Sequence, residues 1–408
     1  MTKSEIVQAA FKVWGQRLYR KTSLSQLALE LKVTKPALYK HFKSKEALCD
    51  AMFLDFFNRF ANFILPYYNE ALDTNDAKKS MLLLSRSIID FFIEDSNDFM
   101  FLIIEVHGNS KYQANMIEQL RLRCIDLNHS IFENKKEYPQ RLQLIMSVCF
   151  CMLASFHGKS HMEHICPGSN DILRCSSAIL AQIERGLNFN SSLIDALDWE
   201  SIEKKVEAFP VTSSPTDTIT KIIKSIIVTV ADAGPWNTSM TAIAESLGLS
   251  KSSLYSHFVN KLDIMKQIFS TIADEIVKRA SSLVKCSTVP EEQLYFAIMG
   301  IISYLKMRPE ILIIMDWIRV RTSDFEKDFS RVQDDVCGIR NVGTIKTIHT
   351  IFADIKNERG SILNDDQTDC VLFLIVNVLM RRPKGIEVAD IKQESFRRLY
   401  RFITLGLE

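Results

Sequence analysis

The sequence predicts an all-α protein that arose by tandem duplication, with a three-helix head and a longer helical body in each unit. Apolar residues recur at helical spacing along most of the 408 residues, and glycine and proline are few, at 13 and 10. One stretch of 24 residues returns at an offset of 216 positions. We therefore expect a first head at 1–48, a first body at 49–190, a connecting helix and linker at 191–216, a second head at 217–264 and a second body at 265–408.

The composition is that of an ordinary soluble protein. Hydrophobic residues make up 47%, and the formal net charge is +1, so any basic surface for nucleic acid must be local. The nine cysteines include no Cys-x-x-Cys pair, which favours a reducing cytoplasm, and the polar start of the chain is unlike a targeting segment. The two most apolar runs, Leu142 to Phe156 and Val371 to Met380, are shorter than the roughly 20 residues that span a membrane. We expect buried helices, a cytoplasmic protein and no membrane partner.

The first head is expected to hold three helices. Thr2 and Glu5 have the spacing of a capping box at the start of the first helix. The apolar face of that helix carries Val7, Ala10, Phe11, Trp14 and Leu18. Two short apolar periods follow between Thr22 and Lys45, separated by Lys32 and Val33. This spacing predicts two short helices that meet across a tight turn, which is a helix-turn-helix.

The second of these short helices should run from Lys35 to His41. Thr34 is a suitable N-cap, and Pro36 is tolerated in the first turn because the amide that it lacks has no intrahelical partner there. We expect three apolar residues to pack inward: Ala37, Leu38 and Phe42. The residues left to face outward are Lys35, Pro36, Tyr39, Lys40 and His41. An exposed, basic helix start that bears an aromatic ring suits the major groove of DNA.

The second copy aligns with the first without a gap. The stretch from Thr238 to Lys261 repeats ten residues of the stretch from Thr22 to Lys45: Thr22/Thr238, Ser23/Ser239, Ala28/Ala244, Leu31/Leu247, Lys35/Lys251, Leu38/Leu254, Tyr39/Tyr255, His41/His257, Phe42/Phe258 and Lys45/Lys261. The preceding helix also repeats, with Ile223, Ile226, Ile227 and Val230 on one face. Both heads should therefore have one fold.

Both copies resemble the DNA-binding head of the tetracycline-repressor (TetR) family, whose pattern is I-A-x-x-A-G-V-S-x-x-x-L-Y-x-[HY]-F-x-x-K. The second copy matches it at Ile243, Ala244, Leu247, Gly248, Leu249, Ser250, Leu254, Tyr255, His257, Phe258 and Lys261. In the first copy Lys32 stands where the pattern has glycine. A left-handed turn residue there costs a non-glycine about 1 kcal/mol.

The resemblance implies DNA binding by both heads. The residues that it places at double-stranded DNA are Thr22, Ser23, Thr34, Lys35, Pro36, Tyr39, Lys40, His41, Lys45, Ser239, Ser250, Lys251, Ser252, Tyr255, His257 and Lys261. We expect four of these residues to contact phosphate: Tyr39, Lys45, Tyr255 and Lys261. The alternative is that they are ordinary surface residues in contact with water. The resemblance also implies that the bodies bind a small-molecule effector and dimerise through their last two helices.

The two heads differ in charge. Residues 1–48 hold ten lysines and arginines and three glutamates, a net charge of +7. Residues 217–264 hold four lysines and four acidic residues, a net charge of zero. Because contacts to phosphate supply most of the sequence-independent affinity for DNA, we expect the heads to bind unequally.

The bodies are expected to be helical throughout. The predicted helices are 78–93, 97–107, 112–133, 139–158 and 171–186 in the first body, and 290–307, 309–320, 326–357, 366–382 and 389–405 in the second. Between the units we expect an amphipathic helix from Leu193 to Phe209 and a stiff linker from Pro210 to Pro215.

Two sets of residues are weaker candidates for binding small ligands. The effector candidates are Phe92, Phe99, His107, Tyr295, Tyr304 and Trp317, for each of which ordinary core packing is the commoner role. The metal candidates are His157, His161, His164 and Cys166, for which a polar helix end is the alternative.

The sequence thus predicts a transcriptional regulator, most simply a repressor that an effector releases from DNA. It predicts no cofactor, and no pattern of an enzyme site is evident. One alternative is a helical sensor or interaction protein in which one or both heads no longer bind DNA.

Overall fold

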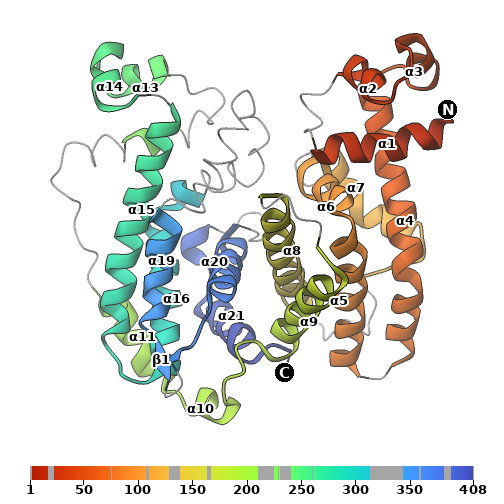
Figure 1. Ribbon diagram of the computed structural model, residues 1–408. Helices are drawn as coiled ribbons and strands as arrows, with labels where there is room; N and C mark the ends of the chain where they lie inside the picture. Colours follow the sequence, from red (N-terminus) through yellow and green to blue (C-terminus); the bar gives the residue numbers. More distant parts are fainter. Residues whose placement is uncertain are drawn as a thin grey trace. The chain divides into compact units, whose positions relative to one another are not determined.

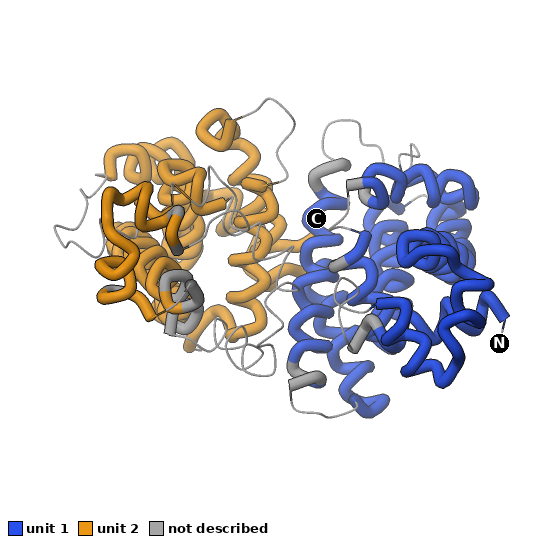
Figure 2. Tube along the Cα trace, turned by 90° about the horizontal axis from the view of Figure 1, so that it is seen from above, with its two compact units in different colours: residues 1–184, 320–324, 407–408 blue, residues 185–319, 325–406 orange. Residues whose placement is uncertain are grey.

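The computed structural model describes residues 2–16, 23–74, 76–106, 110–127, 138–162, 167–209, 225–227, 229, 240–259, 261–312, 343–357, 360–380 and 387–407. These residues are almost entirely helical, which confirms the predicted all-α tandem arrangement (Figure 1). The chain forms two compact units (Figure 2). Unit 1 consists mainly of residues 1–184, and unit 2 consists mainly of residues 185–406.

Unit 1 begins with the head helices α1, α2 and α3 and continues into a long helix, α4. Their bounds are α1 Lys3–Gln16, α2 Leu24–Glu30, α3 Lys35–His41 and α4 Lys45–Asp73. The remaining elements are α5 Ala77–Glu94, α6 Ser96–Met100, a π-helix at Phe101–Val106, α7 Ser110–Arg121, α8 Tyr138–Met162 and α9 Ser169–Arg185.

Phenylalanine rings in stacked and edge-to-face contacts form the core of unit 1. The Phe56 ring lies 5.7 Å from the Phe60 ring on α4 and 6.2 Å from the Phe92 ring on α5, measured between centroids. Phe92 in turn lies 5.8 Å from Phe99 on α6 and 6.2 Å from Phe150 on α8. Aromatic pairs at these spacings add to the free energy gained by burial. This core holds α4, α5, α6 and α8 together beneath the head.

Unit 2 includes two helices that precede its head, α10 (Ser191–Asp195) and α11 (Trp199–Ala208). Its later elements are α13 Met240–Ser246, α14 Lys251–His257, α15 Lys261–Val284, α16 Pro290–Met307, α19 Gly343–Ala353, β1 Lys356–Asn357, β2 Gly360–Ser361, α20 Asp365–Met380, a 3₁₀-helix at Val388–Asp390 and α21 Gln393–Leu405. The two strands form an antiparallel hairpin with Lys356 opposite Ser361. A Cβ on Gly300 would lie 2.6 Å from the Cα of Ala280, so only glycine allows α16 to lie this close to α15.

Several predicted helices are wrong in extent. The helix predicted at 112–133 ends at Arg121, and Cys124 then adopts a left-handed conformation with φ of 64°. The single helix predicted from Leu193 to Phe209 is two helices, because Asp198 accepts a hydrogen bond from the Ser201 amide (3.1 Å) and caps a new helix. Of the helix predicted at 326–357, the described part begins at Gly343, ends at Ala353 and gives way to the hairpin.

One stretch of α8, Arg141–Gly158, is long and apolar enough to cross a membrane on length and composition alone. Core helices of soluble proteins pass the same test. In α8 the side chains of Val148, Cys149 and Leu153 are fully buried in the protein.

A histidine between two carboxylates joins α19 to α20 in unit 2. His349 on α19 places Nδ1 3.2 Å from Asp365 and Nε2 2.9 Å from Asp369, one helical turn apart on α20. Both nitrogens donate only when the imidazole is protonated. The hydrogen bond to Asp369 is the largest cause of a raised pKa at His349, and it outweighs burial, which lowers that pKa.

This histidine should make the stability of unit 2 depend on pH. A raised pKa in the folded state gives a stabilisation that is complete below the unfolded pKa of about 6.5 and is lost as pH rises through the folded value. We expect the midpoint of thermal unfolding to fall between about pH 6 and pH 8, and to fall less in His349→Gln. Equal pH dependence in both proteins, followed by circular dichroism, would contradict this.

Candidate nucleic-acid interface

Side-chain caps fix both short helices of the first head. At α2, Ser23 and Gln26 form a capping box. The backbone N–H of Gln26 donates to Ser23 Oγ (3.1 Å), and the backbone N–H of Ser23 donates to the side-chain oxygen Oε1 of Gln26 (2.7 Å). At α3, the Ala37 amide donates to Thr34 Oγ1 (3.3 Å). The caps matter because seven-residue helices are unstable in isolation.

The turn between these helices has the same geometry in both heads. Lys32 has a φ of 53° and Gly248 a φ of 64°, so both positions are left-handed. The next amide closes the turn in each copy, from Val33 to Ala28 O (2.9 Å) and from Leu249 to Ala244 O (2.8 Å). The expected left-handed conformation at Lys32 is therefore present, and a residue other than glycine adopts it.

The recognition helices α3 and α14 are held by matched apolar residues. Leu38 and Phe42 are buried in the first head, as Leu254 and Phe258 are in the second. Ala37 was expected to pack inward as well, and this prediction was wrong, because Ala37 is exposed. Helical periodicity identifies the apolar side of a helix, but not how far that side is buried.

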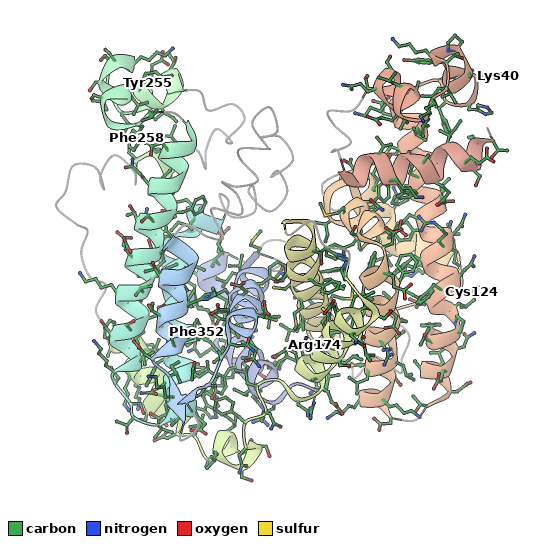
Figure 3. The ribbon with its side chains drawn as sticks, in the orientation of Figure 1. Lys40, Cys124, Arg174, Tyr255, Phe258 and Phe352 are labelled. Atoms are coloured by element: carbon green, nitrogen blue, oxygen red, sulfur yellow. The ribbon has the colours of Figure 1, made fainter. Side chains whose placement is uncertain are left out.

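The exposed side of α3 is basic and carries an aromatic ring. Lys35, Pro36, Tyr39 and Lys40 are exposed, and His41 is half-buried. Figure 3 shows Lys40 at the outer end of the first head. Lys45 is the first residue of α4, and Ser44 caps that helix by accepting a hydrogen bond from the Ala47 amide (3.1 Å). The structure thus brings most of the DNA-contact residues predicted in the first head onto α2, α3 and the start of α4.

In the second head the exposed side is similar in shape and different in chemistry. Tyr255 on α14 is 45% exposed, against 46% for Tyr39, so the two tyrosines are equally exposed. Figure 3 shows Tyr255 in the second head. The Lys251 ammonium lies 6.0 Å from the centre of the Tyr255 ring. Ser250 caps α14 by accepting a hydrogen bond from the Ser253 amide (3.1 Å), and Ser252 is exposed. Of the predicted contacts, Thr22, Ser239 and the side chains of His257 and Lys261 lie outside the described residues.

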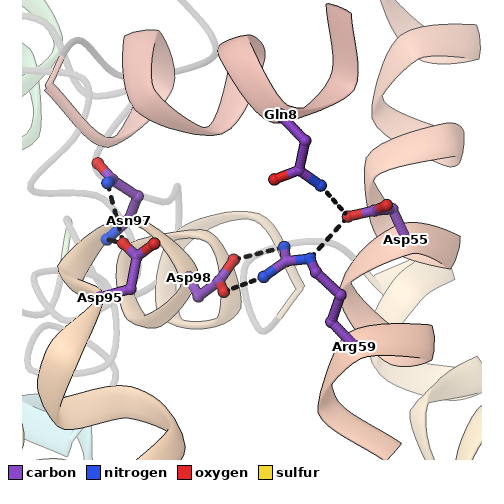
Figure 4. Close-up of polar contacts among 6 residues, drawn as sticks. All are labelled: Gln8, Asp55, Arg59, Asp95, Asn97 and Asp98. Atoms are coloured by element: carbon purple, nitrogen blue, oxygen red, sulfur yellow. Dashed lines mark hydrogen bonds and ion pairs between the residues drawn. The ribbon is translucent and has the colours of Figure 1, made fainter. Parts of the chain in front are cut away.

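A polar network that sequence reasoning missed attaches the first head to its body (Figure 4). Gln8 on α1 donates to Asp55 on α4 (2.9 Å), and Asp55 accepts from Arg59 Nε (2.8 Å). Arg59 reaches α6 through two hydrogen bonds to Asp98, of which the one from Nη2 is 2.7 Å long. The guanidinium also lies 4.8 Å from the centre of the Phe11 ring on α1. Asp55 and Arg59 are four residues apart, but nothing local in the sequence indicates Asp98 as a partner.

Burial makes this ion pair costly to break. Asp98 is only 3% exposed. Burial lowers the pKa of Arg59, but the hydrogen bonds and charges of Asp98 and Asp55 outweigh burial and raise it, so the arginine stays protonated. Removing one partner of a buried pair leaves an uncompensated charge, at a cost of about 3–5 kcal/mol in fully buried cases.

The four effector candidates that the structure describes are buried. Phe92 and Phe99 belong to the aromatic core of unit 1. In unit 2, Tyr304 donates to Glu275 (2.6 Å), and the Tyr295 hydroxyl lies 3.3 Å from Glu203. His107 and Trp317 lie outside the described residues.

The metal candidates are not brought together among the described residues. The buried His157 places Nε2 2.8 Å from the Phe92 carbonyl oxygen, and burial lowers its pKa. His164, Cys166 and the side chain of His161 are not described. Within the described part of the chain, no group of three or more His, Cys, Asp or Glu side chains could hold a metal ion.

The matched turn positions give a test of the head geometry. Lys32→Gly should raise the free energy of unfolding by about 1 kcal/mol, and Gly248→Lys should lower it by a similar amount. The reason is that the left-handed backbone conformation is strained for every residue that has a Cβ. A Cβ at Gly248 would meet no neighbouring atom within 4 Å, so the expected effect there comes from the backbone conformation. Chemical denaturation measures both changes, and two changes of the same sign would contradict the assigned turn.

Comparison with known proteins identifies the heads. Residues 6–52 and 222–268 each match the family described as bacterial regulatory proteins, tetR family. The crystal structure of the TetR family transcriptional regulator PfmR from Thermus thermophilus is also similar. It has 20% sequence identity, covers 46% of this chain and 99% of its own, and superimposes with a TM-score of 0.32. The two family matches are 216 positions apart, as are the two helix-turn-helix heads, so each head carries the DNA-binding domain of this family, and the pair supports a TetR-family transcriptional regulator with two units in tandem.

Proposed function

We propose that this protein is a sequence-specific repressor whose two unlike heads bind an asymmetric operator. The proposal rests on one observation: the two heads share one backbone geometry but present different residues on their exposed surfaces. Both heads have the left-handed turn, the capped recognition helix and the exposed tyrosine. The first has a net charge of +7 and the second a net charge of zero.

The exposed residues of the two recognition helices favour different half-sites. Pro36, Ala37 and Lys40 stand where the second head has Ser252, Ser253 and Ser256. Apolar side chains contact the thymine methyl group, lysine donates to guanine, and serine pairs with several bases. Affinity should therefore come mainly from the first head.

We also propose that one chain acts as its own dimer. DNA-binding proteins of this kind place two heads in successive major grooves, and a single chain of this protein carries both. The closing helices α8 and α9 of unit 1 would pair with α20 and α21 of unit 2. Covalent linkage favours this pairing through effective concentrations that reach the millimolar range. We propose further that the protein is cytoplasmic and that a small-molecule effector releases it from DNA.

Two residues of the first head test whether it binds phosphate. Tyr39→Ala and Lys45→Ala should weaken binding to all DNA sequences, because their expected partners are phosphates. Lys45→Ala should also reduce the slope of log affinity against log salt by about one. A mobility-shift assay with a salt series on DNA from upstream of the protein's own gene measures both. Unchanged affinity in both variants would refute the assignment.

Matched charge reversals test the asymmetry. Lys35→Glu with Lys45→Glu in the first head should abolish binding, whereas Lys251→Glu with Lys261→Glu should only reduce it. Unbiased selection of binding sites by the full-length protein should return two unlike half-sites. Recovery of a perfect palindrome would contradict the proposal. If neither pair of reversals had an effect, the alternative of a sensor that does not bind DNA would be favoured.

Light scattering at micromolar concentration tests the intrachain dimer. We expect the mass of one chain, because pairing within the chain buries the closing helices and leaves them unavailable to a second copy. A stable species of twice that mass would show that pairing occurs between chains instead.

A further inference from the structure

The segment that joins the two units is bound to unit 2. The connector, defined here as residues 186–209, follows α9 and precedes the second head in the sequence. Its first residues lie against the end of α21. The Leu187 amide donates a hydrogen bond to Ile403 O (2.9 Å), and the Phe189 amide donates one to Thr404 O (3.1 Å). This part of the connector is therefore held by backbone hydrogen bonds.

Gly186 is required where the connector begins. Its φ is 55°, and a Cβ there would lie 2.5 Å from the Ile403 oxygen and 2.7 Å from the Gly406 nitrogen. Both the backbone conformation and the close approach exclude any larger residue. The connector thus turns onto unit 2 immediately after α9.

Further along the connector, α11 docks through an ion pair with two additional polar contacts. Glu203 accepts two hydrogen bonds from Arg397 on α21, from Nε (2.5 Å) and Nη2 (2.6 Å), in the forked geometry that makes arginine–carboxylate pairs strong. The Tyr295 hydroxyl on α16 also lies 3.3 Å from Glu203, and Gln393 donates to that hydroxyl (3.3 Å). The Glu203 side chain is 14% exposed, so an unpaired charge there would be costly.

Aromatic packing completes the docking of α11. The Trp199 ring lies 5.1 Å from the Tyr295 ring and 5.7 Å from the Tyr400 ring, and the two tyrosine rings are 5.3 Å apart, all edge-on. The Arg397 guanidinium lies 5.5 Å from the centre of the Trp199 ring. Ile202 is also buried, one helical turn after Trp199. An apolar stripe with these spacings is how an amphipathic helix binds a groove.

The connector ends against α15. The Arg279 guanidinium lies 5.6 Å from the centre of the Phe209 ring. In Figure 1, α11 lies beside the end of α15 that is far from the head helices α13 and α14. The connector is therefore attached at its start, along α11 and at its end.

We propose that the connector is a lock that keeps the joint between the two units short and so fixes the spacing at which the two heads meet DNA. Without the lock, the 40 residues from 185 to 224 would form the tether, with a root-mean-square length on the order of 35 Å if flexible. With the lock in place, only the few residues around Gly186 remain as the tether between the two units. The lock follows from the contacts above, and its effect on DNA rests on the proposed function.

The lock is tested by reversing the charge of Glu203 in the full-length protein. Glu203→Arg places two cations together, and a protease that cuts only after lysine should then cleave after Lys204 and Lys205 at least about tenfold faster, because cleavage follows the population of the undocked helix. Small-angle scattering should show a larger radius of gyration. Glu200→Arg is the matched control, since in the described part of the chain Glu200 pairs with Lys204 on the exposed side of α11, and it should change neither measurement.

The double variant Glu203→Arg/Arg397→Glu should restore the behaviour of the unaltered chain. If Glu203→Arg does not fold, Arg397→Gln is the milder variant and should give the same two changes. Cleavage at the unaltered rate, or faster cleavage with an unchanged radius of gyration, would overturn the lock.

DNA with altered spacing tests the consequence. Inserting about 5 base pairs, half a helical turn, between the selected half-sites should weaken binding of the unaltered chain and of Glu200→Arg at least about tenfold. Glu203→Arg should tolerate the insertion, because a long tether relaxes the geometry. If the unaltered chain binds no DNA, the proposed function fails. If all three proteins bind and respond alike to the insertion, the role of the lock in spacing fails.

Discussion

The structure of each head depends on the burial of one leucine in a helix of seven residues and of the phenylalanine that directly follows this helix. Such a helix does not hold its shape alone in water, so its direction is set by what it packs against. Leu38 and Phe42 anchor α3, and Leu254 and Phe258 anchor α14 in the same way. The left-handed turn brings each helix to this position, and its cap satisfies the first amides. Once these elements are in place, the outward face of the recognition helix is determined.

This constraint explains why the two heads share one backbone geometry and yet differ in the charge and polarity of their exposed faces. Substituting an anchoring residue such as Phe258 would leave a cavity worth about 3–5 kcal/mol, whereas exchanging Lys40 for Ser256 on the exposed face costs the fold almost nothing. The backbone of a duplicated head is therefore held by its core, while its surface is open to change. A difference of seven charges between the heads is compatible with one shared geometry of the turn and the recognition helix.

Local signals in the sequence predicted the heads well and the supporting contacts poorly. Thr34 caps α3 and Gly248 forms the turn, so each acts on neighbouring residues and the sequence alone indicated both roles. The end of α7 could not be found in this way, because Cys124 has no side-chain feature that favours a left-handed conformation. The pairing of Arg59 with Asp98 spans 39 positions, and that of Glu203 with Arg397 spans 194. Such partners become visible only when the fold brings their helices together.

The two units also differ in what supports their long helices. Position 59 of α4 corresponds to position 275 of α15, where the arginine of unit 1 is replaced by a glutamate. Arg59 connects α4 with α1 and α6, whereas Glu275 accepts a hydrogen bond from Tyr304 on α16. Because Arg59 contacts Phe11 on α1 and pairs with the buried Asp98 on α6, one side chain supports both the first head and α6. In unit 2 the equivalent position strengthens the contact between two body helices. The two units therefore share the turn and recognition-helix geometry of their heads and differ in the contacts that support the long helix behind each head.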